Sequence, residues 1–346
     1  MTGSSASPDS SEVAHLSVPV ADALAGNAGY LLSRMETHDA DEQAERLRCW
    51  DQCYEQLSPG RFRGSLSEIW LGPMQLFREV TNQSVRETGS CWQGSRTFGI
   101  PLAMEGEAAY CGRPMSAEAV LTLCGGDELD FRSPRFLDIV GICVQAPVFQ
   151  RLTRCLEGDE AERRLEFPRL LRVAPDRLEE LRALLRSVFG VLDACPAMLD
   201  YAQVRKNIEH SLLSRLVALA SEAGKEPESP VGYLVRRRVV ERARGYLLAH
   251  RDEPVSVSDL CALTGVSRRT LQYCFQEVLG VKPVHYLRAL RLAGVRRELK
   301  AHGSRFASVG DVAARWGFWH LSHFAADYRK MFGELPSETL SSSRPA

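Results

Sequence analysis

Residues 257–279 read VSDLCALTGVSRRTLQYCFQEVL, a stretch that predicts two short helices joined by a tight turn. Leu260 and Leu263 give the first helix an apolar face. Gly265 follows at a point where such a turn requires a residue that is free to adopt positive φ. Ser267 suits the N-cap of the second helix, because its hydroxyl can accept a backbone N–H. The order is typical of a helix-turn-helix unit.

Apolar and polar side chains of the second helix fall on opposite faces. The inward positions are Leu271, Phe275 and Val278. The outward positions are Arg268, Arg269, Gln272 and Gln276. Arg and Gln can each form two hydrogen bonds to a base edge, with guanine and adenine respectively, so these four residues are predicted to bind DNA. For this segment taken alone, a solvated polar face is the alternative.

Residues 309–332 read VGDVAARWGFWHLSHFAADYRKMF and repeat the pattern. Val312 and Ala313 face inward, and Gly317 makes the turn. The predicted apolar stripe of the following helix consists of Leu321, Phe324, Tyr328 and Phe332. The residues left to face outward near its start are His320, Ser322, His323 and Ala326. We expect His320, Ser322 and His323 to contact DNA, partly by positioning phosphates.

A long helix is predicted between the two units, from Pro283 in its first turn to Lys300. Two units on one rigid helix could place two recognition helices in successive major grooves, roughly 34 Å apart on one DNA face. Arg288, Arg291 and Lys300 on this helix are either phosphate clamps or solvated charges, and the sequence leaves both readings open.

Charge is divided unevenly along the 346 residues, although 43 Lys+Arg and 44 Asp+Glu give a formal total of −1. From Arg236 to the end there are 19 Lys+Arg and 10 Asp+Glu, a net charge of +9, which leaves −10 for the preceding part. The stretch SEAGKEPESP (221–230) is charged, carries two prolines and reads as a linker. Such a split points to a nucleic-acid-facing part, with random fluctuation as the alternative.

The N-terminal part predicts a different architecture. Residues 1–30, rich in Ser, Ala, Gly and Pro, read as a mobile tail, and 34–57 read as a helix. Short strand-like runs then indicate an antiparallel barrel or jelly roll. These runs are 67–71, 76–80, 84–88, 98–102, 119–123 and 137–144. Two helices with apolar stripes follow, at 178–192 and 208–219, serving either as core or as a dimer seam.

Enzymatic chemistry has little support in the sequence. None of the eight histidines lies between residues 39 and 209, so the predicted barrel offers no imidazole to a metal ion or a nucleophilic cysteine. No nucleophile elbow or nucleotide-binding glycine loop is present. We therefore predict no catalytic residue, metal site or cofactor. The sequence contains no window of 18 uncharged apolar residues, so it predicts no membrane-spanning helix. The cysteine usage favours a cytoplasmic protein.

A ligand pocket remains possible inside the predicted barrel. Aromatic walls with a few convergent charges suit a small polar ligand. The candidate effector-binding residues are Trp70, Arg78, Glu79, Trp92 and Phe98. For each of the aromatic residues, a plain core role is the alternative.

Residues 236–340 resemble the DNA-binding domain of the AraC/XylS family of bacterial transcription regulators. The resemblance rests on the first unit and on DVAARWGFWHLSHFAADYRKMFGELPSE (311–338). The second stretch carries the family's alanine pair, Gly-Phe at the turn, core aromatics, and Gly333 with Pro336-Ser337 at the exit. Gly310 and Thr339 depart from the usual pattern at the edge of the second unit.

The stretch WDQCYEQLSPGRFRGSLSEIWLGPMQLFREVTNQSVRETGSCW (50–92) is similar to the ethanolamine-operon activator branch of the same family. This resemblance implies a cupin-like N-terminal barrel that senses an effector and helps the protein to dimerise. It also implies ethanolamine and adenosylcobalamin as the effectors.

Together these observations predict an α+β protein with a cupin-like β-barrel, flanking helices and an all-α double helix-turn-helix domain. The expected parts are a tail (1–30), an effector-sensing and dimerisation domain (31–220), a linker (221–232) and a DNA-binding domain (233–340). The expected function is that of a transcriptional activator responding to a small molecule of a catabolic pathway. Its expected partners are promoter DNA, RNA polymerase and a second copy of the chain. The alternatives are control by a protein partner and a cupin-type enzyme fused to a helical domain.

Overall fold

The computed structural model describes residues 29–160, 167–222, 232–301 and 308–342. The predicted tail lies outside these residues except for Gly29 and Tyr30, and Tyr30 already begins a strand. Most of the predicted linker lies outside them too. The last helix before it ends at Glu222, and the next begins at Tyr233.

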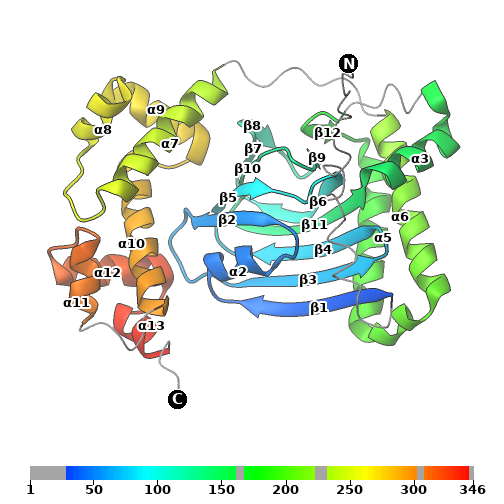
Figure 1. Cartoon of the computed structure of the whole chain (residues 1–346), viewed down its shortest axis with the longest axis horizontal. Helices are drawn as coiled ribbons and strands as arrows, with labels where there is room; N and C mark the ends of the chain where they lie inside the picture. Colours follow the sequence, from blue (N-terminus) through cyan, green and yellow to red (C-terminus); the bar gives the residue numbers. More distant parts are fainter. Residues whose placement is uncertain (1–28, 161–166, 223–231, 302–307, 343–346) are drawn as a thin grey trace, which may run out of the picture.

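Two antiparallel sheets form the N-terminal half (Figure 1). The seven-stranded sheet has the order β1 (Tyr30–Thr37), β3 (Gly64–Leu71), β4 (Met74–Thr81), β11 (Phe136–Gln145), β6 (Ser95–Glu105), β9 (Ala119–Cys124) and β12 (Leu170–Arg172). The five-stranded sheet has the order β2 (Asp51–Gln56), β5 (Val85–Ser90), β10 (Leu129–Arg132), β7 (Ala108–Tyr110) and β8 (Arg113–Met115). Five of the six predicted strand-like runs lie within observed strands, and the sixth, 84–88, overlaps most of β5.

The sheets face each other but do not close into the predicted barrel. Among the described strands, no ladder joins an edge of one sheet to an edge of the other. Instead of a closed ring of strands, side-chain packing between the two inner faces holds the sheets together. In β4, for example, Phe77 and Glu79 point between the sheets, while Leu76 points to the opposite face, because successive side chains of a strand alternate.

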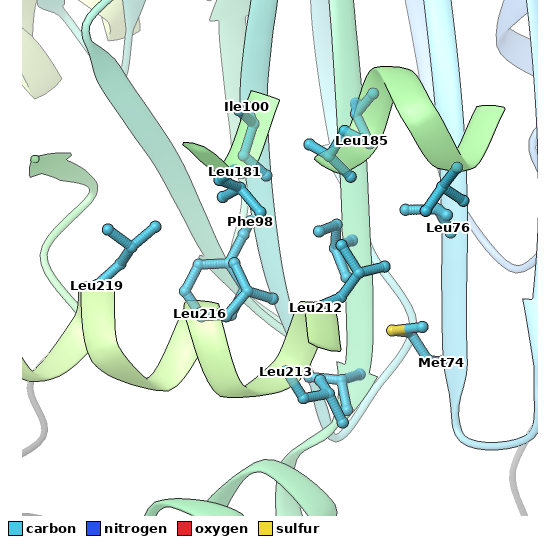
Figure 2. Close-up of a cluster of buried hydrophobic side chains, with 14 of the residues drawn as sticks. Met74, Leu76, Phe98, Ile100, Leu181, Leu185, Leu212, Leu213, Leu216 and Leu219 are labelled. Carbon is cyan, nitrogen blue, oxygen red and sulfur yellow. The ribbon is translucent and has the colours of Figure 1, made fainter. Parts of the chain in front are cut away.

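Among the described residues, the helices α3 (Ala146–Glu157), α5 (Pro175–Ala194) and α6 (Ala202–Glu222) cover the outer face of the seven-stranded sheet. A short 3-10 helix, η1 (Pro196–Asp200), joins the last two. The predicted stripes on α5 and α6 are core: Leu181, Leu185, Leu212 and Leu216 are fully buried. Figure 2 shows them meeting outward-pointing side chains of β4 and β6, so these residues belong to the core.

The predicted helix over 34–57 is wrong for most of its length. Only α2 (Ala40–Arg46) is helical there, between β1 and β2. Asp39 caps this helix by accepting the backbone N–H of Asp41 at 2.9 Å. Cys49, with φ at +62°, then turns the chain back into β2. Pairing of β1 with β3 and of β2 with β5 outweighs the local helical pattern.

In the described part of the C-terminal half there are seven helices: α7 (Tyr233–Ala249), α8 (Val257–Thr264), α9 (Arg268–Leu279), α10 (Pro283–Ala301), α11 (Val309–Arg315), α12 (Leu321–Phe332) and α13 (Pro336–Ser342). One apolar core lies around α7, α8 and α9, and a second lies around α11, α12 and α13. The long helix α10 contributes to both, as Figure 1 shows. This half lies beside the β2 end of the five-stranded sheet.

Candidate nucleic-acid interface

Hydrogen bonds at the helix ends shape the first helix-turn-helix unit, α8 and α9. Ser256 and Asp259 cap α8 reciprocally: the Asp259 N–H donates to Ser256 Oγ (3.3 Å) and the Ser256 N–H donates to Asp259 Oδ2 (2.8 Å). Gly265 ends α8 with φ at +70°, as predicted. Ser267 Oγ accepts the N–H of Thr270 at 3.1 Å and thereby caps α9, also as predicted.

Helix α9 buries one face and exposes the other. Its buried residues are Leu271, Cys274, Phe275, Val278 and Leu279. Its exposed residues include Arg268, Arg269, Gln272 and Gln276. None of these four side chains forms a hydrogen bond or an ion pair within the described part of the chain, so their donors are available to an external partner.

The second unit, α11 and α12, is built in the same way. Ser308 Oγ accepts the Asp311 N–H at 3.2 Å, and Gly317 has φ at +73° in the turn. His320, Ser322 and His323 are exposed at the start of α12. The prediction that Leu321 belongs to the apolar stripe is wrong, because its side chain is 52% exposed, near Trp319, which is 66% exposed.

Helix α10 holds the two units together. Tyr286 and Leu290 pack into the first core, and Val295 and Leu299 pack into the second. At Gly294 a Cβ atom would lie about 2.2 Å from the Trp316 ring, so only glycine lets this ring pack directly on the helix. The two units therefore form one rigid pair.

The basic residues of α10 are engaged within the chain. Arg288 pairs with Asp327 (3.3 Å), Arg291 donates to the Glu253 carbonyl (2.8 Å), and Lys300 pairs with Asp39 (3.0 Å). These three side chains are therefore not merely solvated charges, because each has a partner within the chain.

Ion pairs join the two halves. Arg296, 7% exposed, donates to Asp39 Oδ2 at 2.5 Å, and Lys300 binds the same oxygen. Burial alone would raise the pKa of Asp39, but the charges of Arg296 and Lys300 outweigh it and hold the pKa below the usual value. Arg244 of α7 pairs with Glu55 of β2 at 2.6 Å. This network fixes the helical half against the sheets.

A second buried network centres on Arg86 of β5, which is 2% exposed. Its guanidinium pairs with Asp130 of β10 (3.3 Å) and with Glu241 of α7 (2.5 Å). Tyr233 Oη donates to the other oxygen of Asp130 at 2.7 Å. Although burial opposes it, the attraction of both carboxylates raises the pKa of Arg86, so the charge persists at the interface.

The predicted effector residues do not converge on one place. Phe98 is fully buried against the covering helices, with its ring centroid 5.4 Å from that of Phe149. Trp70 and Trp92 pack against each other at 6.1 Å. Arg78 forms two hydrogen bonds with Asp138, at 2.9 and 2.7 Å. Of the five residues, only Glu79 lines the cavity between the sheets.

That cavity has a volume of about 40 Å³. Its walls include Trp50, Phe77 and Phe131, and the rings of Trp50 and Phe77 meet edge to face at 5.5 Å. Gly141 makes room for the Phe77 ring, because a Cβ atom there would lie about 2.1 Å from it. The sequence alone did not identify Trp50 and Phe131 as lining residues, because whether their side chains face inward depends on the strand register.

Two buried carboxylates line the same cavity. Glu79 accepts hydrogen bonds from Gln43 Nε2 (2.9 Å) and Tyr54 Oη (3.1 Å), whereas Glu87 Oε1 has no partner. No lysine or arginine of the described residues pairs with either carboxylate. Burial raises the pKa of Glu79, and burial together with the nearby Glu79 raises that of Glu87 well above its usual value. The sequence pattern did not point to Glu87.

Comparisons with known proteins support the interpretation of the helical half as a helix-turn-helix domain. Residues 260–342 match a family model described as a helix-turn-helix domain. The chain is 34% identical over 110 residues to the XylDLEGF operon transcriptional activator 2 of Pseudomonas putida, covering 32% of this chain and 70% of that protein. It is 32% identical over 162 residues to the "Probable thc operon regulatory protein" of Rhodococcus erythropolis. That match covers 46% of this chain and about half (47%) of the relative.

Among solved structures, the chain is similar to a probable AraC family transcriptional regulator from Rhodopseudomonas palustris CGA009. The identity is 38%, with a TM-score of 0.29, over 31% of this chain and 99% of that one.

Two helix-turn-helix units on one rigid helix, with unpaired donors on the exposed face of α9, define a DNA-binding protein of the transcription-regulator class. The chain belongs to the AraC/XylS family of transcriptional regulators. Its similarity to the ethanolamine-operon branch remains an expectation. Within the described residues, no helix is long and apolar enough to cross a membrane, and no group of metal-ligating side chains is assembled.

Proposed function

We propose that the protein activates transcription by inserting α9 and α12 into successive major grooves of promoter DNA. The observation that carries the proposal is the exposed, unpartnered face of α9, whose cationic and amide donors match the edges of guanine and adenine. Arg268, Arg269, Gln272 and Gln276 are the proposed base contacts. His320, Ser322 and His323 are the proposed contacts of α12, partly to phosphates.

The activator role has support in the named function of the Pseudomonas relative. Contact with RNA polymerase, homodimer formation and a cytoplasmic location belong to the same proposal. We also propose that the protein is not an enzyme, in line with the regulatory names of both relatives.

The experiment that tests DNA recognition begins with genome-wide mapping of the bound sites. Duplexes from those sites then serve in fluorescence anisotropy titrations at fixed salt concentration, because phosphate contacts make affinity salt-dependent. Arg269→Ala should lose affinity for a bound site but not for scrambled DNA. Arg177→Ala on α5, an exposed arginine on the far half, is the matched control. Equal affinity of Arg269→Ala and Arg177→Ala would overturn the assignment of α9.

The effector proposal places a small organic cation in the cavity between the sheets. Buried carboxylates without a cationic partner attract an ammonium group, and aromatic walls add cation–π attraction. The cavity lined by Glu79, Glu87, Trp50 and Phe77 offers both features, so an ethanolamine-like effector is compatible with its chemistry.

A thermal-shift titration of the full chain tests this choice. Ethanolamine should raise Tm, because a ligand that binds only the folded state stabilises it, whereas uncharged ethylene glycol should not. Glu87→Gln should abolish the shift. If neither compound shifts Tm while a protein partner does, the alternative of control by a partner protein gains support.

A further inference from the structure

Two large apolar side chains stand in solvent at the start of α12, on either side of its N-cap residue His320. Trp319 is 66% exposed and Leu321 is 52% exposed. A single exposed apolar residue needs no explanation. The N-terminal residues of a recognition helix, however, are the ones that reach the edges of bases. An exposed apolar pair at this place therefore bears on what the second helix-turn-helix unit reads.

The segment that carries Trp319 is anchored by its aromatic neighbours. Trp316 is 6% exposed, and its indole N–H donates to Glu298 Oε1 at 3.0 Å. Phe318 packs against the second core, with its ring centroid 5.0 Å from that of Phe324. Two of the three aromatic rings in this turn thus fix the backbone, and the third, that of Trp319, is presented to solvent from a rigid base.

Leu321 lies against the start of α11. A Cβ atom at Gly310 would lie 3.4 Å from Leu321 Cδ1, which is van der Waals contact. A side chain at position 310 would therefore cover part of the leucine. Glycine, one of the two departures from the family pattern, leaves that apolar surface open beside Trp319.

Polar groups around the pair suit the surface of DNA. His320, Ser322 and His323 are exposed and alternate with the two apolar residues. The first turn of α12 contains no acidic residue that would repel phosphates. An apolar pair among uncharged and weakly basic donors matches a groove in which apolar groups project between two phosphate backbones.

We propose that Trp319 and Leu321 contact thymine methyl groups in the major groove. The C5 methyl of thymine is the apolar group that distinguishes this base there, and a leucine side chain has no polar atom with which to read any other feature. The second unit then recognises thymine by apolar contact, whereas α9 recognises guanine and adenine by hydrogen bonds. The inference rests on the proposed function, because it requires α12 to lie in the groove.

Replacement of thymine by uracil in the DNA tests the proposal, because it removes the methyl group and keeps the base pair. Duplexes from a mapped site, with each dT replaced in turn by dU, serve in anisotropy titrations of the full chain at fixed salt concentration. Replacement at a contacted thymine should weaken binding about fourfold, the effect expected for the burial of one methyl group.

Variants assign each methyl contact to a side chain. Leu321→Ala should remove the penalty of dU at its contacted thymine, and Trp319→Ala should do so at its own, because the partner of the methyl group is already absent. Leu335→Ala changes a leucine that is 36% exposed between α12 and α13, and this matched control should keep every penalty. A variant with the wild-type pattern of penalties would overturn the assignment of its side chain.

The same titrations separate this inference from the proposed function. If the chain prefers a mapped site to scrambled DNA but no dU replacement weakens binding, the thymine contacts are overturned and DNA recognition stands. If the chain shows no preference for any mapped site, the proposed function fails and the inference fails with it.

Discussion

The exposed face of α9 and the space between the sheets both hold polar atoms without a hydrogen-bond partner among the described residues, and the two regions differ in exposure. On α9, Arg269 and Gln272 stand in solvent, where water satisfies their donors. Between the sheets, Glu87 is 6% exposed and one of its oxygens has no hydrogen bond. An exposed donor without a protein partner costs folding almost nothing, whereas a buried unpartnered carboxylate costs stability. The buried carboxylate therefore lowers the stability of the fold, whereas the exposed donors of α9 do not.

The largest expected effect concerns a buried charge that does have partners. Arg86→Met should lower the free energy of unfolding by about 3–5 kcal/mol, because Asp130 stays buried after losing the guanidinium. Urea denaturation of the full chain measures the change. A loss below about 1 kcal/mol would mean that Tyr233 and Arg237 alone satisfy Asp130. The burial of Arg86 and Asp130 would then contribute little to the free energy of unfolding.

Removal of an exposed donor should separate function from stability. Arg269→Ala should weaken binding to a mapped site by about 1–3 kcal/mol, as expected for the loss of a bidentate base contact. The unfolding free energy should stay within about 0.5 kcal/mol of the wild-type value. Anisotropy and urea denaturation on the same preparation check both halves of the statement. A comparable loss of stability would show that the side chain has a structural role.

The buried carboxylate should behave in the opposite way. Glu87→Gln should raise the unfolding free energy by about 1 kcal/mol near neutral pH while abolishing ethanolamine binding. The folded-state pKa of Glu87 is raised above its ordinary value. The wild-type protein is therefore most stable below the ordinary carboxyl pKa, and its stability falls as pH rises toward the folded-state pKa.

The difference in Tm between Glu87→Gln and the wild type should therefore widen from about pH 4 upward. Thermal melts across a pH series measure it. Because Glu79 titrates beside Glu87, Glu79→Gln is the companion variant, and a pH-independent difference in both variants would contradict the assignment.

The smallest expected effect concerns the N-cap of α9. Ser267→Ala should cost about 1 kcal/mol of stability by leaving the Thr270 N–H without its cap. Ser308→Ala makes the same change at α11 and should cost a similar amount. Thermal denaturation of both variants compares the two units. A much larger effect at one of them would show that the repeated units are not equivalent in stability.

Sequence reasoning succeeded where a local rule decides the outcome. Gly265, Ser267 and the alternation along α9 follow from neighbours within one or two turns, so the first unit could be predicted almost residue by residue. It failed over 34–57, where a helical pattern yields to strand pairing with partners far along the chain. It also failed at Leu321, whose side chain is 52% exposed although its position fits the apolar stripe of α12.

By itself, the sequence determined the double helix-turn-helix, its donor-rich face and the acidic–basic division of the chain. These properties rest on short-range periodicity and on charge, which survive without any tertiary contact. Only the tertiary structure decided that the sheets remain unclosed, that Glu79 and Glu87 share a cavity, and that Asp39 of the sheet half pairs with Arg296 of α10. The physical reason is that strand register and domain docking depend on contacts between distant residues, whose partners cannot be read from local spacing.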